Sequence, residues 1–316
     1  MALSGEFELI RWFRKQSRVP DHGFTRLGIG DDCAILQPSA GLELVVTTDM
    51  LMDGRHFVLE RHGPEAVGRK AMGVNLSDIA AMAAVPKAAF IAVALPRRQG
   101  HACDIARGLH AGVAEMANRF DVTLAGGDTN AWDGPLVICV TLIGETPPGT
   151  AAIRRSGALA GDGIFVTGPL GGSILGRHLN PSPRIAEALA LREQFGIHAL
   201  IDISDGLAAD LGHILEESGN RGAVLEAEAV PIHPDAVTLS STTGRTPLDH
   251  AINDGEDFEL CAVLGPQSAA RIESRPAERV RLIRVGTIVG QPGLRIRDRE
   301  GRVTPIESAG FDHLND

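Results

Sequence analysis

The chain has 316 residues, of which 44% are hydrophobic and 22% are charged, with a formal net charge of −10. This length suits one large or two ordinary domains, and the composition is typical of a soluble globular protein. The acidic balance argues against nucleic acid or an anionic membrane as a partner, and no apolar run approaches the roughly 20 residues of a membrane span.

The first half of the chain is predicted to alternate between strands and helices. Segment 4–13 predicts a short amphipathic helix without the apolar core of a signal peptide, which favours a cytoplasmic location. The β-branched segment 42–48 predicts a strand that ends at Asp49, and Pro64 is predicted to open a helix that continues to about Ala84. The other expected elements of this half are strands 88–95, 120–125 and 136–144, a helix near 101–119 and a glycine turn at Gly126-Gly127-Asp128.

A segment rich in Pro, Gly, Ala and Arg at 146–162 predicts a domain boundary, which gives domains at 1–148 and 149–316. The second half is predicted to repeat the alternating pattern, so the fold class is α/β or α+β with two layers in each half. Its expected elements are strands 163–167, 199–203 and 258–264, a glycine-rich stretch at 168–176, and a helix that ends near 217.

Four cysteines lie far apart in the sequence. Cys33, Cys103, Cys139 and Cys261 form no CxxC pair, which predicts reduced thiols rather than a zinc site or a disulfide framework.

Acidic residues recur at the expected strand ends and glycine turns. Any one of them has an ordinary explanation, because Asp is a favoured turn and capping residue. That explanation weakens for Asp78, which lies inside a predicted helix, and for acids embedded in apolar sequence, where an ionised carboxylate needs a partner or a metal ion. Oxygen-rich, sulfur-free clusters suit Mg²⁺, Mn²⁺ or Ca²⁺. The residues concerned are Asp31, Asp32, Asp49, Asp128, Asp202, Asp205, Glu256 and Asp257.

Several nucleotide-binding motifs are missing from the sequence. It contains no GxxxxGK[ST] motif, no HRD and DFG pair and no GxSxG element. These absences exclude a P-loop enzyme, a protein-kinase-like enzyme and a serine hydrolase of the nucleophile-elbow type. A nucleotide enzyme with this sequence must use another fold.

Eight motifs in order resemble the thiamine-monophosphate kinase family. They are GEFELI (5–10), GIGDDCA (28–34), TTDMLMDGRHF (47–57), NLSDIAAM (75–82), GGDT (126–129), RSGA (155–158), DISDGL (202–207) and GEDFEL (255–260), and GFDH (310–313) resembles the family's C-terminal aromatic motif. The resemblance implies the two-domain fold of aminoimidazole ribonucleotide synthetase, with an N-terminal sheet that forms a homodimer and a C-terminal α/β domain.

The resemblance also implies roles for individual residues. It implies Mg²⁺ ligands at Asp32, Thr47, Thr48, Asp49, Asp78, Asp128, Asp202 and Asp205, of which Asp49, Asp128 and Asp205 are expected to be essential for catalysis. It implies ATP contacts at Gly127, Asp128, Arg155 and Ser204. It places thiamine monophosphate at His56, Glu256 and Phe311, with Phe311 stacked on a thiamine ring.

The implied reaction is direct in-line transfer of the γ-phosphoryl group of ATP to thiamine monophosphate, with several Mg²⁺ ions and ATP as co-substrate. Segment 168–184 is shorter than in many relatives, which bears on the acceptor pocket. Two alternatives stay open from the sequence. One is an ATP-dependent ligase of the purine type from the same superfamily, and the other is a catalytically idle relative that binds Mg²⁺ and nucleotide.

Overall fold

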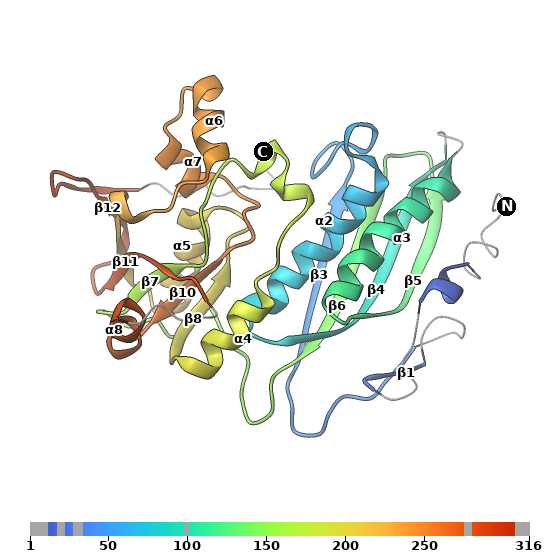
Figure 1. Ribbon diagram of the computed structural model, residues 1–316, viewed down its shortest axis with the longest axis horizontal. Coiled ribbons are helices and arrows are strands. Elements are labelled where there is room, and N and C mark those ends of the chain that lie inside the picture. Colours follow the sequence, from blue (N-terminus) through green and yellow to red (C-terminus); the bar gives the residue numbers. More distant parts are fainter. Residues whose placement is uncertain (1–11, 18–22, 28–33, 98–100, 275–279, 307–316) are drawn as a thin grey trace. The chain divides into compact units, whose positions relative to one another are not determined.

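The structure is a computed structural model that describes residues 12–17, 23–27, 34–97, 101–274 and 280–306 (Figure 1). The chain divides into two compact units. The first comprises residues 1–79, 84–151 and 179–181, and the second comprises residues 80–83, 152–178 and 182–316. The boundary expected from the sequence, at 148–149, falls close to residue 151, where the main part of the first unit ends.

The first unit is built on a four-stranded sheet with the strand order β3-β6-β4-β5. Strands β4 and β5 are parallel, and the other neighbours are antiparallel. Two helices, α2 and α3, lie side by side on one face of this sheet (Figure 1). The elements are β3 (Leu44–Met52), α2 (Leu59–Ala81), β4 (Val85–Pro96), α3 (Ala102–Arg119), β5 (Thr123–Trp132) and β6 (Val137–Glu145), with a separate two-stranded sheet of β1 (Thr25–Leu27) and β2 (Ile35–Leu36).

Strand β3 shows why the sheet has one covered face and one open face. Val45 and Leu51 are buried, whereas Val46 and Met50 are exposed. Side chains alternate between the two faces of a strand, so the odd-numbered positions pack toward the helices and the even-numbered positions point away from them. A sheet whose second face carries apolar side chains in this way has an unsatisfied packing surface.

Helices α2 and α3 approach each other at glycines. A β-carbon at Gly112 would overlap the carbonyl oxygen of Glu65, and one at Gly68 would overlap the carbonyl oxygen of Leu109. Only glycine permits backbones to come this close. The long part of α2 begins at Pro64, as expected, because Gly63 adopts φ 74° and interrupts the helix there.

The predicted glycine turn at Gly126-Gly127-Asp128 is wrong, because β5 continues through it to Trp132. Gly127 lies where a β-carbon would overlap the carbonyl oxygen of Ile91 on the neighbouring strand. The glycines therefore serve close strand packing rather than chain reversal. Asp49 likewise lies in the middle of β3 and not at its end.

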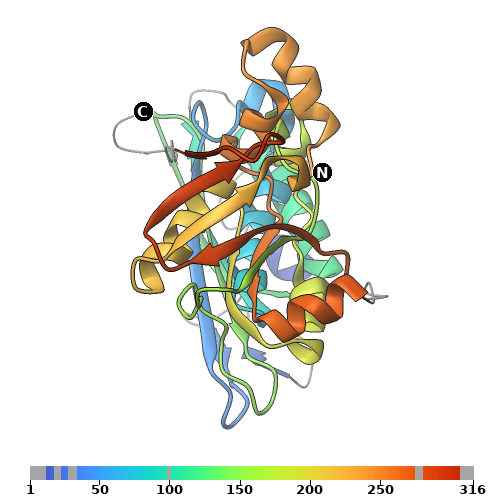
Figure 2. The same ribbon diagram turned by 90° about the vertical axis from the view of Figure 1, so that its left-hand side faces the viewer.

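The second unit contains a seven-stranded sheet with the order β13-β12-β9-β11-β7-β10-β8, drawn in green to red in Figure 2. All neighbours are antiparallel except β12 and β9. The strands are β7 (Gly163–Val166), β8 (Ile197–Asp202), β9 (Gly222–Glu226), β10 (Leu260–Leu264), β11 (Ile283–Val289), β12 (Gly293–Arg297) and β13 (Val303–Pro305). The helices are η2 (Ser173–Leu175), η3 (Arg177–Leu179), α4 (Ile185–Gln194), α5 (Leu207–Glu217), η4 (Ala227–Ala229), α6 (Pro234–Thr243), α7 (Pro247–Asn253) and α8 (Pro266–Ser274).

Strand β7 is buried along its whole length and divides the core of this unit. Ile164 and Val166 belong to the larger cluster, which includes Leu211 and Ile214 of α5. Phe165 belongs to a smaller cluster with Ala269 and Ile272 of α8. Because alternate residues of one strand enter different clusters, helices cover both faces of this sheet.

Several expectations from the sequence are confirmed, and the expectation for the cysteines concerns one residue that the structure does not describe. The strands expected at 163–167, 199–203 and 258–264 and the helix expected to end near 217 all form, with bounds within two residues. No helix in the described part of the chain is long and apolar enough to cross a membrane. The three described cysteines, Cys103, Cys139 and Cys261, are free thiols, while Cys33 lies outside the described residues.

Candidate active site

The first group of expected ligands lies where strand β3 faces helix α2. Thr47 and Asp49 are half-buried and alternate with buried Val45 and Leu51, so they share the covered face of the sheet. The Thr47 hydroxyl donates a hydrogen bond to a carboxylate oxygen of Asp78 on α2. The structure therefore brings Thr47 and Asp78 together and places Asp49 on the same face, two residues along the strand.

Thr48 points to the opposite face of the sheet. It is exposed, and its hydroxyl lies 3.0 Å from the Thr141 hydroxyl and 3.4 Å from the Cys139 sulfur on strand β6. The structure therefore separates the hydroxyls of Thr47 and Thr48, although the two residues are adjacent in sequence.

Gly127 and Asp128 lie on β5, at the other edge of the sheet from β3. The pairing register places Asp49 level with Val140, Ile91 and Gly127 on successive strands. Three steps of about 4.8 Å between strands put the backbones of Asp49 and Gly127 about 14 Å apart. Asp128 is exposed. Within the sheet of a single chain, Asp49 and Asp128 therefore lie apart.

His56 is fixed in the turn between β3 and α2. Its Nδ1 accepts a hydrogen bond of 3.0 Å from the backbone N–H of Met52, so the ring carries its proton on Nε2. Its carbonyl oxygen accepts a hydrogen bond of 2.6 Å from the ammonium group of Lys70, a lysine that is 0% exposed. The sequence did not single out Lys70, although a lysine within the apolar face of a predicted helix was a signal.

The second group lies at the turn between β8 and α5 in the second unit. Asp210 is buried, and its Oδ2 accepts hydrogen bonds of 3.0 Å from the backbone N–H groups of both Ser204 and Asp205. Burial, followed by the charges of Asp202 and Asp205, raises the pKa of Asp210 to about 8. The turn that carries Ser204 and Asp205, both expected site residues, is therefore held by a carboxyl group from the helix that follows it.

The donor atoms at this turn suit a divalent cation. One ligand atom from each of Asp205, Asp210 and His213 lies within 4.8 Å of the others. A positive ion would offset the negative charges of Asp202 and Asp205, which after burial are the next causes of the raised pKa of Asp210. Carboxylate oxygens are the ligands that Mg²⁺ prefers. The sequence did not predict Asp210 and His213, yet their spacing of three places them on one face of a helix.

Glu256 lies in a strained loop bonded to this turn. Glu256 and Phe258 have φ values of 61° and 53°, which non-glycine residues rarely adopt. The N–H of Glu256 donates to the Ser204 carbonyl at 2.7 Å, and that of Phe258 donates to the Ile203 carbonyl at 2.8 Å. The structure thus brings Ser204 and Glu256 together, and strain of this kind is concentrated at functional sites in proteins.

The remaining expected residues are dispersed. Asp202 is buried at the end of β8, beside the turn, whereas Arg155 is exposed in the segment that precedes β7. Asp32 and Phe311 lie outside the described residues.

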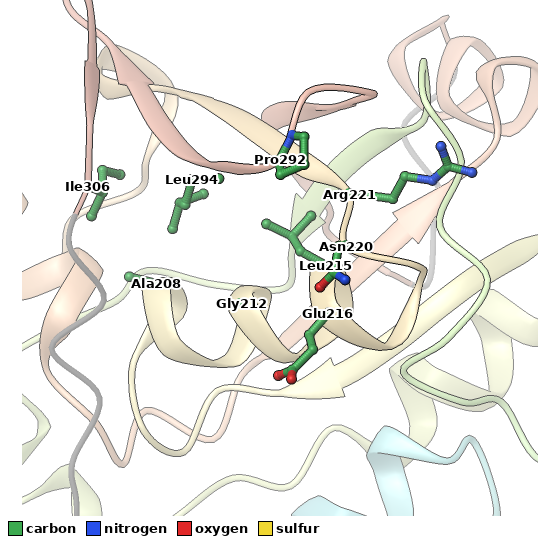
Figure 3. Close-up of a pocket in the computed structure, with 10 residues that line it drawn as sticks. Ala208, Gly212, Leu215, Glu216, Asn220, Arg221, Pro292, Leu294 and Ile306 are labelled. Atoms are coloured by element: carbon green, nitrogen blue, oxygen red, sulfur yellow. The ribbon is translucent and has the colours of Figure 1, made fainter.

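An open cavity of about 300 Å³ in the second unit lies between one side of α5 and strand β12 (Figure 3). Its lining is largely apolar and includes Leu215 and Leu294, with Arg221 at its margin. None of the expected site residues lines it. The cavity therefore does not coincide with either group of candidate ligands.

Comparisons with known proteins identify relatives of the whole chain. Residues 30–146 match the family model described as AIR synthase related protein, N-terminal domain. The chain is 43% identical over 296 residues to the thiamine-monophosphate kinase of Rhodopirellula baltica, which covers 91% of each chain. The crystal structure of thiamine-monophosphate kinase from Stenotrophomonas maltophilia superposes with a TM-score of 0.77 and 34% identity over 93% of this chain and 95% of that one. The structure of AaThiL complexed with AMPPCP and TMP superposes with a TM-score of 0.75 and 28% identity over 98% and 97%.

Proposed function

Because the chain belongs to the thiamine-monophosphate kinase family, we propose that it phosphorylates thiamine monophosphate to thiamine diphosphate with ATP. The observation that carries this conclusion is the 43% identity to a thiamine-monophosphate kinase over 91% of both chains. ATP as co-substrate is supported by a similar protein that was solved with AMPPCP and TMP. The fold and the enzyme class agree with what the sequence motifs implied.

The reaction is an in-line displacement at the γ-phosphorus of ATP. A phosphate oxygen of thiamine monophosphate forms the new bond, the bond to the bridging oxygen of the β-phosphate breaks, and ADP leaves. The second pKa of a phosphate monoester is about 6, so the acceptor is already ionised near neutral pH and needs no strong base. The enzyme must instead bring two polyanions together on a chain of net charge −10.

The residues proposed to hold Mg²⁺ carry carboxylate or hydroxyl oxygens, which fits that ion. Bound Mg²⁺ would supply the positive charge that offsets repulsion between the phosphates and stabilises charge in the transition state. Asp49, Asp128 and Asp205 are proposed to be essential for catalysis. The full proposed set is Asp32, Thr47, Thr48, Asp49, Asp78, Asp128, Asp202 and Asp205.

Other residues are proposed to bind the two substrates directly. Gly127, Asp128, Arg155 and Ser204 are assigned to ATP, with Arg155 on the phosphates. His56, Glu256 and Phe311 are assigned to thiamine monophosphate. The bond from the Met52 N–H to Nδ1 of His56 selects the tautomer that carries its proton on Nε2.

The direct test is an assay of the purified protein with ATP, Mg²⁺ and thiamine monophosphate, with thiamine diphosphate measured by its fluorescence after oxidation. Product is expected, and excess EDTA is expected to abolish it; restoring Mg²⁺ is expected to restore the rate. Product formation that persists at full rate in EDTA would contradict the metal requirement. ATP binding without product would contradict the kinase activity.

The two alternatives from the sequence are not favoured. A purine-type ligase would share the fold but act on another acceptor, and an idle relative would bind Mg²⁺ and nucleotide without turnover. The relatives that match most of the chain are named as thiamine-monophosphate kinases. Formylglycinamidine ribonucleotide is therefore expected to be inert as an acceptor in the same assay.

A homodimer through the open face of the first unit's sheet is part of the proposal. Leu44, Val46 and Met50 on β3 are 48%, 60% and 57% exposed, an apolar row that a second copy would cover.

The proposed dimer predicts that a charge introduced on this face of the sheet separates the two copies. Val46→Glu is expected to convert a dimer into a monomer, because a carboxylate would be buried without a partner. Sedimentation velocity measures the change. The matched control is Val303→Glu on strand β13, where a similarly exposed valine lies in the second unit. A wild-type monomer, or a Val46→Glu variant that remains dimeric, would contradict this interface.

A cytoplasmic location is also proposed, as the acidic composition of the sequence favours. Recovery of the native protein in the membrane fraction of a cell extract would contradict it.

A further inference from the structure

We propose that Arg177 is a positioning residue for the acceptor: through Asp257 it fixes the loop that carries Glu256, and so sets the affinity for thiamine monophosphate. This inference rests on the proposed function, because it takes Glu256 as a contact of the acceptor. It gives segment 168–184 a role in binding the acceptor, which the sequence left open.

The loop has a backbone that needs external support. Asp257 lies between Glu256 and Phe258, and both neighbours have positive φ values, 61° and 53°. Each such residue is held only where surrounding contacts over-determine it. The loop's own hydrogen bonds reach the backbone of Ile203 and Ser204, and these leave the side chain of Asp257 to be fixed from another direction.

That direction is segment 168–184. One carboxylate oxygen of Asp257 accepts a 3.0 Å hydrogen bond from the Arg177 guanidinium, and the other accepts a 2.7 Å bond from the backbone N–H of Gly171. Arg177 also donates to the Gly171 carbonyl at 2.8 Å and to Asp235 at 3.1 Å. The guanidinium therefore ties together the loop, the glycine-rich turn and the start of α6.

Further contacts between the same two segments act on either side of Asp257. The Gly172 N–H donates to Asp254 at 3.0 Å, and the Ser173 hydroxyl donates to the Gly255 carbonyl at 2.7 Å. On the far side, Arg184 forms an ion pair with Glu259. The loop is thus held on both sides of Glu256 by one short segment.

Of these contacts, those of Arg177 are expected to change the position of Glu256 most when they are removed. The side chain of Asp257 is 0% exposed, and burial raises its pKa to about 7 against the opposing effects of Gly171 and Arg177. Removing the guanidinium leaves a buried carboxyl group without its cation, which favours movement of the loop toward water. Because Glu256 is the next residue, the acceptor contact moves with it.

The test compares Arg177→Met with wild type in two measurements. The first is steady-state kinetics, in which KM for thiamine monophosphate is expected to rise about 10-fold, since a misplacement of about 1 Å can cost far more than that. KM for ATP and kcat are expected to stay within about 3-fold, because the turn at Ser204 keeps its own support from Asp210. The second is amide hydrogen exchange, in which peptides covering 254–259 are expected to exchange faster.

Two variants keep the test decisive. Arg297→Met removes an exposed arginine that pairs with Glu226 across strands β12 and β9, and it is expected to change neither measurement. If Arg177→Met folds poorly, Arg177→Lys replaces it in the test. Lysine keeps a cation that can reach one carboxylate but not three partners, so a KM between those of wild type and Arg177→Met is expected.

The outcomes separate this inference from the proposed function. Unchanged exchange at 254–259 in Arg177→Met overturns the inference, as does an equal rise in KM for ATP and for thiamine monophosphate. A wild-type protein that does not phosphorylate thiamine monophosphate overturns the proposed function instead. The exchange comparison then still decides whether Arg177 fixes the loop.

Discussion

Replacing Asp49 with asparagine is expected to lower kcat by at least about 10³-fold, because Asp49 is proposed to hold Mg²⁺, and a bound metal ion would supply several kcal/mol of transition-state stabilisation. Asparagine has nearly the same size as aspartate but carries no charge. Asp49 is half-buried in the middle of β3, on the covered face of the sheet and two residues from Thr47, whose hydroxyl bonds to Asp78 of α2. The substitution should therefore preserve the fold and change the free energy of unfolding by less than about 1 kcal/mol.

The measurement is kcat over a range of Mg²⁺ concentrations, together with thermal unfolding. Asp104→Asn is the matched control, because Asp104 is an exposed carboxylate on α3 whose ion pairs lie at the surface. It is expected to keep full activity. An Asp49→Asn enzyme that retained a tenth of the wild-type kcat would show that Asp49 is not an essential ligand.

Asp210→Ala is expected to have the second largest effect, on both stability and turnover. The substitution removes the acceptor for two backbone N–H groups, at Ser204 and Asp205. An unsatisfied donor costs about 1–3 kcal/mol when it is fully buried, and because both of these are only partly buried, a combined loss of about 2–4 kcal/mol in the free energy of unfolding is expected. The turn that carries Asp205 would lose its geometry, and kcat should fall by at least about 10²-fold.

Asp210→Asn distinguishes the role of this residue as an acceptor from a role as a metal ligand. The asparagine carbonyl can accept the same two hydrogen bonds, so stability should fall by less than about 1 kcal/mol and kcat by less than about 10-fold. Denaturant unfolding and steady-state kinetics give both quantities. If Asp210→Asn is as inactive as Asp205→Asn while remaining folded, Asp210 acts through its charge and the hydrogen-bonding explanation is wrong.

The sequence predicted the elements of this fold where local patterns carried them. The continuous apolar segments at 136–144 and 163–167 form strands, and the helix near 101–119 forms almost as expected. Glycine was misleading at Gly126 and Gly127, because a residue that favours a turn also permits close strand packing. That second use depends on Ile91 and Phe90 of a neighbouring strand, which no local pattern reveals.

The sequence predicted which residues belong to the candidate site, but not how the fold arranges them in space. Motif matches identified Asp49 and Asp128 together, yet the strand order β3-β6-β4-β5 puts them at opposite edges. Strand order is a property of long-range pairing and is not contained in the spacing of two aspartates. Asp210 was missed for the opposite reason: its role consists of bonds to backbone N–H groups, which have no residue-type signature.

The pairing of strand β7 has a consequence for the synthesis of the chain. Strand β11 (Ile283–Val289) is one of its two neighbours and follows β7 (Gly163–Val166) by about 120 residues, which is about 6–24 s of translation at about 5–20 residues per second. The sheet of the first unit is complete by Glu145, so it can form while the ribosome is still working on the second. During that interval the apolar strand β7 has an open edge, a state that favours aggregation and chaperone binding. Nascent chains stalled before residue 283 should therefore be the most dependent on chaperones.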